Sequence, residues 1–345
     1  MTVFVTGGTG FIGGRLMPQL IDRFGAASIT LLSHTASKPH EAAAAERFRQ
    51  AGVTVIEGDL TQAPISASAP PPRVDLVFHL GANIDTDTPE EEHRVNDAGT
   101  ANLLAWLGES IRGGRLVYTS SIAVHDRAGI ASGPITETSP YTPRTAYGVT
   151  KLGGERIIQD AAARLGYTWT INRLPTVYGP GGKQGGMFDL LITGVQGGGL
   201  ISRVNWPGKT SVIFVDDVGA ILIDLGVRAD AANEIYCLGS GEDVTLADIA
   251  TDIAAVLARR QRPLRVPGFA WSVMRRVAWS PLVGALVPRR LHVTYWRLTL
   301  VVDDGFWYDA RKFLSQNRLP LVMLPEGLRR TLETESGAVV STRDI

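Results

Sequence analysis

The stretch Val3-Phe4-Val5-Thr6-Gly7-Gly8-Thr9-Gly10-Phe11-Ile12-Gly13-Gly14 opens the chain and decides its fold. Its first three residues form an apolar run typical of a buried strand, and a helical pattern follows from Arg15 to Ile21. Glycines at 7, 10 and 13 allow a sharp turn and a close backbone approach to an anion, and the last allows the helix to pack on the strand. The free N–H groups at the start of the helix would then face a pyrophosphate. The stretch therefore predicts a strand–turn–helix unit that binds a dinucleotide.

Strand-like and helix-like segments alternate through the first half of the chain. The predicted strands are residues 3–5, 27–32, 53–56, 74–80 and 115–119, and the predicted helices are 42–50, 90–107 and 147–164. This alternation predicts an α/β fold with a doubly wound parallel sheet of the Rossmann type. Ligands of such sheets bind beyond the carboxyl ends of the strands, so we expect the residues at these ends to line one crevice. They are Thr6, Ser33, Asp59, Gly81 and Ser121.

The end of the second predicted strand bears on the choice of dinucleotide. In this architecture an acidic residue about 20 positions past the glycines grips the ribose 2′-hydroxyl of NAD. This chain has Ser33 and His34 at that place, followed by Lys38, and no acidic residue. The missing acid favours NADP, with NAD as the alternative. Arg15, just inside the first predicted helix, is also expected to reach the phosphates of the dinucleotide.

Tyr147 and Lys151 lie four residues apart at the head of a predicted helix. That spacing places both side chains on one helical face. An ammonium beside a phenol favours the phenolate, which lowers the pKa of the tyrosine towards the working pH. The hydroxyl of Ser121, at the end of the fifth predicted strand, would complete the set by hydrogen-bonding a substrate oxygen. We predict that these three residues are catalytic.

Composition excludes several other classes of protein. The 345 residues carry a formal net charge of zero and are 44% hydrophobic, which suits a large α/β domain and gives no reason to expect a nucleic acid as partner. The single cysteine, Cys237, excludes an internal disulfide and a cysteine-based metal cluster, and its apolar neighbours predict a buried thiol. No secretory leader is visible and no metal site is predicted, so we expect a cytoplasmic protein.

Further short motifs follow the first one in order along the chain. The full series is Thr6-Gly7-Gly8-Thr9-Gly10-Phe11-Ile12-Gly13; Gly58-Asp59-Leu60; His79-Leu80-Gly81-Ala82; Val95-Asn96-Asp97-Ala98-Gly99-Thr100; Thr119-Ser120-Ser121; Tyr147-Gly148-Val149-Thr150-Lys151; Arg173-Leu174-Pro175-Thr176-Val177-Tyr178-Gly179-Pro180; Val215-Asp216-Asp217-Val218; and Leu238-Gly239-Ser240-Gly241. Together these motifs resemble the extended short-chain dehydrogenase/reductase family, of the NAD-dependent epimerase/dehydratase type, over residues 1–260.

The resemblance implies an enzyme that moves a hydride between a nicotinamide dinucleotide and a carbon bearing oxygen. It implies that Tyr147 is the acid/base, that Lys151 holds the nicotinamide ribose and that Ser121 positions the substrate oxygen. In addition to Tyr147 and Lys151, the predicted dinucleotide contacts are Gly7, Gly10, Phe11, Ile12, Gly13, Ser33, His34, Asp59, Leu60, Leu80, Gly81, Ala82, Asn96, Thr119, Leu174 and Pro175. Relatives also suggest a homodimer.

Departures from the family pattern bear on the substrate. Nucleotide-sugar epimerases of the family usually carry an asparagine where this chain has Thr176, and an arginine for the substrate phosphate near Thr210, where only Lys209 is adjacent. The pattern Arg173-Leu174-Pro175-Thr176 is more similar to branches that act on hydroxyls of apolar molecules. We therefore expect an oxidoreductase that interconverts a secondary alcohol and a ketone, or reduces an aldehyde, on an apolar or aromatic small molecule. The alternatives are a nucleotide-sugar epimerase or reductase with tightly held NAD, and a non-catalytic dinucleotide-binding regulatory protein.

The rest of the chain is expected to build a smaller lobe. The predicted Rossmann core comprises residues 1–175, to which 205–240 return. A substrate-binding lobe comprises 176–204 and 241–332, and a polar tail follows at 333–345. Within the lobe we predict a substrate loop and short helix over 181–199, an amphipathic helix over 245–259 capped by Thr245, and another over 320–332.

Residues 267–300 combine large apolar side chains, Trp279 and Trp296 among them, with arginine pairs at 275–276 and 289–290. Prolines at 281 and 288 and the arginines interrupt any apolar run long enough to span a membrane. We favour a helical lobe that covers an apolar substrate cavity. The alternative is a patch at a membrane interface, with arginines at the headgroups and tryptophans below them.

Overall fold

The computed structural model describes all residues except 35–37, 86–87, 126–133, 279, 289–294, 296–298, 303–305 and 342–345. The chain divides into two compact units. Unit 1 comprises Met1–Ala128, Pro140–Leu174 and Asp216–Tyr236, and unit 2 comprises Gly129–Ser139, Pro175–Val215 and Cys237–Ile345.

Unit 1 is built on a seven-stranded sheet with the strand order β3-β2-β1-β4-β5-β6-β9. The strands are β1 (Val3–Thr6), β2 (Ile29–Ser33), β3 (Thr54–Glu57), β4 (Leu76–His79), β5 (Arg115–Ser121), β6 (Thr168–Leu174) and β9 (Glu234–Cys237). Every neighbouring pair from β3 to β6 is parallel. The predicted doubly wound parallel sheet is therefore confirmed, and each predicted strand exists. Strands β6 and β9 have no counterpart among the predicted ones.

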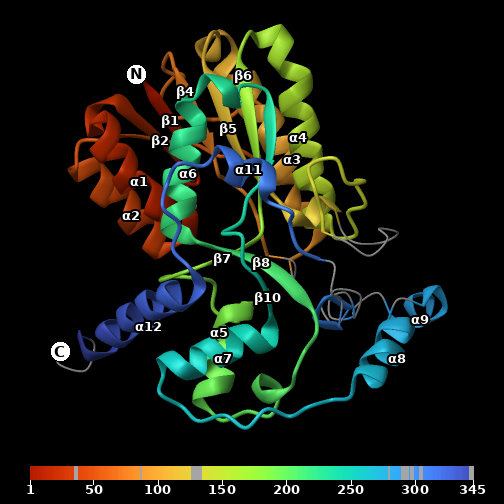
Figure 1. The fold of residues 1–345 in the computed structure, drawn as a ribbon. Helices are drawn as coiled ribbons and strands as arrows, with labels where there is room; N and C mark the ends of the chain where they lie inside the picture. Colours follow the sequence, from red (N-terminus) through yellow and green to blue (C-terminus); the bar gives the residue numbers. More distant parts are fainter. Residues whose placement is uncertain are drawn as a thin grey trace. The chain divides into compact units, whose positions relative to one another are not determined.

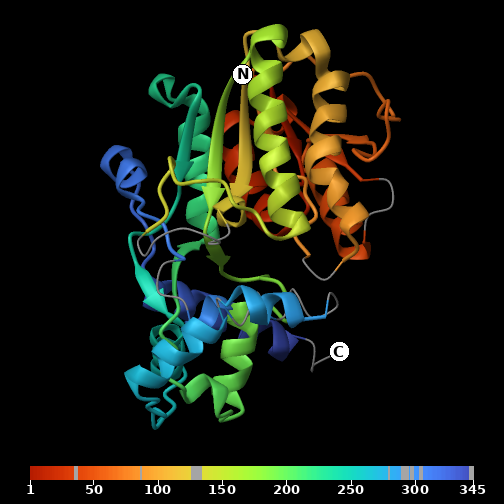
Figure 2. The same cartoon turned by 90° about the vertical axis from the view of Figure 1, so that its right-hand side faces the viewer.

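Helices cover both faces of this sheet (Figures 1 and 2). The helices α1 (Phe11–Phe24), α2 (Pro39–Gln50) and α6 (Val215–Val227) lie on one face, and α3 (Arg94–Leu107) and α4 (Ala146–Leu165) lie on the other. Short 3-10 helices span Ala26–Ser28, Glu90–His93, Gly108–Ile111, Ile122–His125 and Ala229–Ala231. On the α3–α4 face, leucine and isoleucine side chains of both helices pack on β1, β4 and β5 in a core that excludes water.

Local sequence explains where α4 begins and how closely it approaches the sheet. Thr145 caps the helix, since its hydroxyl accepts a hydrogen bond from the Gly148 amide at 3.0 Å. A Cβ at Gly148 would collide with the Ala123 carbonyl, and one at Gly154 would collide with the Tyr118 hydroxyl. Glycine at both positions therefore lets the head of α4, with Tyr147 and Lys151, lie against the end of β5.

A buried ion pair joins α4 to β6. Arg173 donates from Nη2 to Glu155 Oε2 at 2.8 Å and from Nε to Oε1 at 3.0 Å, and both side chains are almost fully excluded from solvent. Ser120 on β5 donates to the same Oε1 at 2.5 Å, while Tyr141 accepts from Arg173 Nη2 at 2.8 Å. His125 Nε2 lies 3.0 Å from Arg173 Nη1, and its Nδ1 lies 3.1 Å from the Pro140 carbonyl.

These distances assign the tautomer of His125. A guanidinium only donates and a carbonyl only accepts, so Nε2 accepts from Arg173 and Nδ1 donates to Pro140. The network thus matches one buried cation with one carboxylate, and it links α4, two strands and the segment that precedes α4.

Unit 2 contains a three-stranded sheet with the order β10-β8-β7, formed by β7 (Thr176–Tyr178), β8 (Lys209–Phe214) and β10 (Asp243–Thr245). Its helices are α5 (Met187–Gln196), α7 (Leu246–Val256), α8 (Gly268–Ala278), α9 (Pro281–Leu286), α11 (Arg311–Gln316) and α12 (Leu324–Ser341), with a 3-10 helix at Ile201–Arg203. Apolar side chains of α5, α7 and α12 form a core with β7 and β8.

Several predictions about the second half are tested by these elements. The α7 helix begins as predicted with Thr245, whose hydroxyl accepts from the Asp248 amide at 3.1 Å. The α12 helix does not end near residue 332 as predicted, because it continues to Ser341. Cys237 is buried, as predicted. Among the described residues, none of the helices has the length and apolar character needed to cross a membrane.

The ion pair between Glu155 and Arg173 leads to a testable prediction about the stability of the fold. In Arg173→Met, Glu155 keeps a buried charge without its cation, so we expect the free energy of unfolding to fall by about 3–5 kcal/mol. Arg112→Met is the matched control, because Arg112 pairs with Glu109 at the surface and should leave the transition nearly unchanged. Urea unfolding followed by circular dichroism measures both. Equal effects of the two substitutions would contradict the assignment.

Candidate active site

The turn between β1 and α1 has the geometry of an anion cradle. Gly7 has a positive φ of 71°, and a Cβ there would lie 2.5 Å from the Gly81 nitrogen. A Cβ at Gly13 would collide with the Gly7 carbonyl, whereas one at Gly10 would meet only the Gly7 oxygen, at 3.5 Å. Gly10 is the N-cap of α1, so no side chain caps the amides of the first turn, which Phe11 and Ile12 begin. The residues present therefore fit a pyrophosphate held by backbone N–H groups.

A chain of hydrogen bonds fixes the neighbouring edge, at the end of β4. The Gly81 amide donates to Thr6 Oγ1 at 3.1 Å, and Thr6 Oγ1 lies 2.7 Å from His79 Nδ1. His79 Nε2 lies 2.9 Å from Thr100 Oγ1, whose own proton is donated to the Asn96 carbonyl. His79 therefore donates from Nε2 and accepts at Nδ1.

Burial, aided by the nearby Lys151 charge, lowers the pKa of His79 to about 3. The side chain is thus a neutral core histidine that holds the segment Leu80-Gly81-Ala82 against Gly7.

Ser33, His34, Asp59 and Leu60 gather at the ends of β2 and β3. Ser33 and Leu60 are buried, and His34 Nε2 lies 3.5 Å from Asp59 Oδ1. Burial acts to raise the pKa of Asp59, but hydrogen bonds from the Thr61 hydroxyl and amide, at 2.7 and 2.8 Å, outweigh it, so the pKa lies below its usual value. The structure thus brings together the four residues predicted for this end of the dinucleotide.

Ser121 and Tyr147 lie where the head of α4 packs against the end of β5. Ser121 is the last residue of β5, and its hydroxyl accepts from the Ala123 amide at 3.2 Å. Burial raises the pKa of the Tyr147 phenol, and a hydrogen bond with the Ser121 side chain acts in the opposite direction. The structure therefore brings these two predicted residues together.

Lys151 lies one turn further along α4 and is fully buried. Its Nζ is 4.1 Å from the centroid of the Tyr118 ring, a cation–π distance. Burial lowers the pKa of Lys151 to about 7, although the charge of Glu155 acts to raise it. The expectation that Lys151 lowers the pKa of Tyr147 is not met here, because burial leaves that pKa above its usual value and only the Ser121 side chain opposes the effect of burial.

The remaining predicted contacts fall in different surroundings. Leu174 is buried opposite Ser121 in the β5–β6 register, and Pro175 is the first residue of the next segment of unit 2. The Thr119 hydroxyl donates to the His79 carbonyl at 3.4 Å. The side-chain amide of Asn96 forms its hydrogen bonds with other residues of the protein. Its Oδ1 accepts from the Asn83 amide, and its Nδ2 donates to the Asn83 carbonyl and Thr150 Oγ1.

Arg15 has a partner that differs from its expected one. Its position just inside α1 suggests a phosphate contact, but the guanidinium pairs with both carboxylate oxygens of Asp216, at 2.5 and 2.9 Å.

Glu155 and Arg173 support the site, although the sequence analysis did not predict them as site residues. The signal was available, because Glu155 continues the four-residue spacing of Tyr147 and Lys151 along one helical face.

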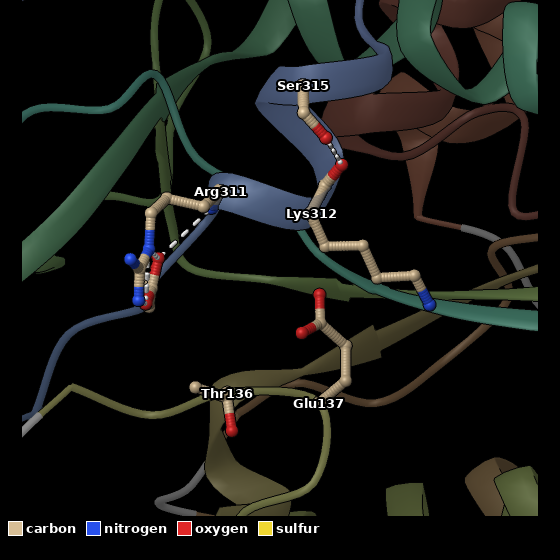
Figure 3. A pocket seen from close by; sticks show the side chains of 6 residues that line it. Thr136, Glu137, Arg311, Lys312 and Ser315 are labelled. Carbon is tan, nitrogen blue, oxygen red and sulfur yellow. Dashed lines mark hydrogen bonds and ion pairs between the residues drawn. The ribbon is translucent and has the colours of Figure 1, made fainter.

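A separate cavity of about 440 Å³ lies in unit 2 (Figure 3). Its lining residues are Thr136, Glu137, Asp309, Arg311, Lys312 and Ser315. Arg311 pairs with Asp309, and the Glu137 carboxylate accepts from the Cys237 amide at 2.9 Å, so its charges have partners within the chain. None of the predicted catalytic residues lines it.

Comparison with known proteins agrees with this geometry. The chain is 24% identical over 337 residues to a UDP-glucose 4-epimerase from Vibrio cholerae, covering 92% of this chain and 96% of that protein. It is 28% identical over 288 residues to a 3β-hydroxysteroid dehydrogenase/Δ5→4-isomerase from Mycobacterium tuberculosis, covering 77% of this chain and 72% of that protein.

The fold is shared with solved structures. A UDP-glucuronic acid 4-epimerase from Bacillus cereus in complex with NAD superimposes with a TM-score of 0.73 at 19% identity, covering 98% of this chain and 99% of that one. Residues 3–239 match the profile of the NAD dependent epimerase/dehydratase family. The chain therefore belongs to this family and is an NAD(P)-dependent enzyme of the extended short-chain dehydrogenase/reductase type.

Proposed function

We propose that the chain interconverts a secondary alcohol and a ketone, or reduces an aldehyde, on a largely apolar small molecule. The observation that supports this reaction is the placement of three groups: the Tyr147 phenol at the head of α4, Ser121 at the end of β5 against which that helix packs, and the buried Lys151 one turn after Tyr147. A phenol, a hydroxyl and an amine in this order are the groups that proton exchange with a substrate oxygen requires.

Each side chain then has a defined task. The dinucleotide, when bound, supplies or accepts the hydride. In reduction, Tyr147 gives its phenolic proton to the substrate oxygen, and in oxidation its phenolate takes that proton back. Ser121 donates a hydrogen bond to the same oxygen and orients it. Lys151 would hold the nicotinamide ribose, and its pKa of about 7 lets the amine exchange a proton at neutral pH.

Two threonines of unit 2 support an apolar substrate. Thr176 and Thr210 occupy the places where nucleotide-sugar epimerases of the family carry an asparagine and a phosphate-binding arginine. Their hydroxyl oxygens lie 3.2 Å apart and hydrogen-bond to one another. Lys209 has its Nζ 5.5 Å from the centroid of the Trp307 ring. A bidentate phosphate clamp is absent from these positions, and a lysine does not replace one. The steroid dehydrogenase relative agrees with this choice.

The second candidate is a nucleotide-sugar epimerase with tightly held NAD. It is supported by the relative from Vibrio cholerae, which is named a UDP-glucose 4-epimerase and is matched over nearly its whole length. The two candidates differ in one observable property, because an epimerase turns over without net consumption of added dinucleotide, whereas a dehydrogenase consumes it.

For the dinucleotide we propose NADP. Strand β2 ends at Ser33 and is followed by the exposed His34, so this strand end has no carboxylate to repel a 2′-phosphate. Asp59, the nearby acid, is engaged by Thr61 and faces His34.

Tyr147→Phe tests the reaction. Loss of the phenolic proton should lower turnover about 10²–10⁴-fold while dinucleotide binding, followed by fluorescence, changes little. Tyr167→Phe is the matched control, because the Tyr167 hydroxyl donates to the Ile158 carbonyl inside the fold. The assay compares NADP⁺-dependent oxidation of a hydroxysteroid with conversion of UDP-glucose without added dinucleotide. Conversion of UDP-glucose alone would replace the proposal with the epimerase, and full turnover by Tyr147→Phe would refute both.

His34→Asp tests the choice of dinucleotide. A carboxylate at the end of β2 should weaken NADPH binding about ten-fold or more through repulsion of the 2′-phosphate, with NADH binding retained. His40→Asp, the same change on the first turn of α2, controls for long-range charge. Tighter binding of NADH than of NADPH by the unsubstituted protein would overturn the preference.

Lys151→Met tests the buried amine through stability. The pKa of Lys151 falls from 10.5 to about 7 on folding, so the unfolded chain binds more protons between these values. Burying the amine therefore costs stability in full below about pH 7, and the cost shrinks as the pH rises towards 10.5. The gain in Tm on replacing Lys151 with Met should be larger at pH 6 than at pH 9. Lys38→Met, at an exposed position, should show no such pH dependence, and a pH-independent gain for Lys151→Met would contradict the burial.

A further inference from the structure

The helices α8 and α9 present large apolar side chains to solvent. Phe269, Val273 and Val277 on α8 are 75%, 58% and 52% exposed, and Leu282 and Leu286 on α9 are 77% and 83% exposed. We call these five residues the α8–α9 surface. The two helices are neighbours within unit 2 (Figure 1). Trp279, Arg289, Arg290 and Trp296 lie outside the described residues.

The spacing of these residues shows that each helix exposes a continuous apolar stripe. Positions 269, 273 and 277 follow one another at intervals of four, as do 282 and 286, so each set lies on one helical face. The other face of α8 is already anchored, since Trp271 is buried with its ring centroid 5.3 Å from that of Trp206. Arg275 on the same helix donates to the Val302 carbonyl at 3.2 Å. The exposed stripe is therefore additional to the apolar contact that holds α8.

The segment that carries this surface contains arginines but no acidic residues. Between residues 253 and 288 the sequence has six arginines and no aspartate or glutamate, in a chain whose net charge is zero. The arginines are Arg259, Arg260, Arg262, Arg265, Arg275 and Arg276. All except Arg275 are exposed, and none of the other five forms an ion pair with a described residue. Apolar stripes on a segment with this charge, with the exposed Arg276 on α8 itself, fit a partner that is both apolar and anionic.

We propose that the α8–α9 surface binds the face of a lipid bilayer that contains anionic lipids. The apolar stripes enter the boundary between headgroups and acyl chains, and the arginines contact lipid phosphates. The helices have eleven and six residues, about 16 and 9 Å, against a hydrocarbon core of about 30 Å, so they lie in the plane of the interface. A second copy of the chain fits less well, because a twofold contact through this surface would bring two sets of unpaired arginines together.

The test is flotation of the full chain with vesicles. Protein should float with vesicles of phosphatidylcholine containing about 30% phosphatidylglycerol, and much less with phosphatidylcholine alone, and added salt should weaken the binding. No flotation with the anionic vesicles would overturn the proposal.

Substitutions separate the two parts of the surface. Phe269→Ser combined with Leu286→Ser should lower the partition coefficient about ten-fold or more, since two large apolar groups no longer enter the interface. Arg265→Glu with Arg276→Glu should abolish the preference for anionic vesicles. The controls are Val227→Ser, an exposed apolar residue at the end of α6, and Arg23→Glu on α1, which should both bind like the unsubstituted chain.

Two further measurements keep the result unambiguous. Thermal unfolding must coincide for all variants, because the substituted side chains are exposed. Light scattering gives the oligomeric state, and a dimer that dissociates in Phe269→Ser/Leu286→Ser without any vesicle binding would assign the surface to a second copy instead. Equal flotation of the surface variants and the controls would also refute the membrane assignment.

Discussion

The buried ion pair between Glu155 and Arg173 is the contact on which the catalytic end of unit 1 depends. Taking two charges out of water is costly, and the cost is offset only when the remaining donors and acceptors are satisfied. Here the guanidinium donates to both carboxylate oxygens, to Tyr141 and to His125, and Ser120 donates to the carboxylate as well. Because the partners come from β5, β6, α4 and the segment before α4, one satisfied cluster fixes the position of the helix that carries Tyr147.

The same ion pair explains the unusual state of Lys151. Glu155 is one turn from Lys151 on α4, but both of its oxygens are engaged by Arg173, which is always charged. The lysine therefore receives only the longer-range attraction of the carboxylate, and burial lowers the pKa of the amine to about 7. The carboxylate thus pairs with the arginine, which keeps its charge, and leaves the buried lysine able to titrate near neutral pH.

Local pattern predicted the fold well where consecutive segments pair or pack, and less well where distant segments meet. The glycine turn and the alternating segments predicted β1 to β5 with their order of appearance, and the structure confirms the sheet. Strand β6 was missed because it contains Arg173, a charge that an isolated sequence gives no reason to bury. Arg15 was expected near phosphate, yet its partner Asp216 lies 201 residues away. Asn96 is held by Asn83 and Thr150, contacts that only the packing of α3 and α4 creates.

The α8 helix also shows what the sequence pattern alone does not determine. Its sequence has the pattern of an amphipathic helix, but this pattern does not determine which apolar side chains are buried. The structure buries Trp271 and exposes Phe269 and Val277. A helix of eleven residues is marginal in water by itself, so its stability comes from contacts such as that between Trp271 and Trp206. The outer stripe adds nothing to that contact and exposes apolar area that promotes association in water. Under the proposed binding to a bilayer, this apolar area is removed from water, and the exposed Arg276 on the same helix meets an anionic surface.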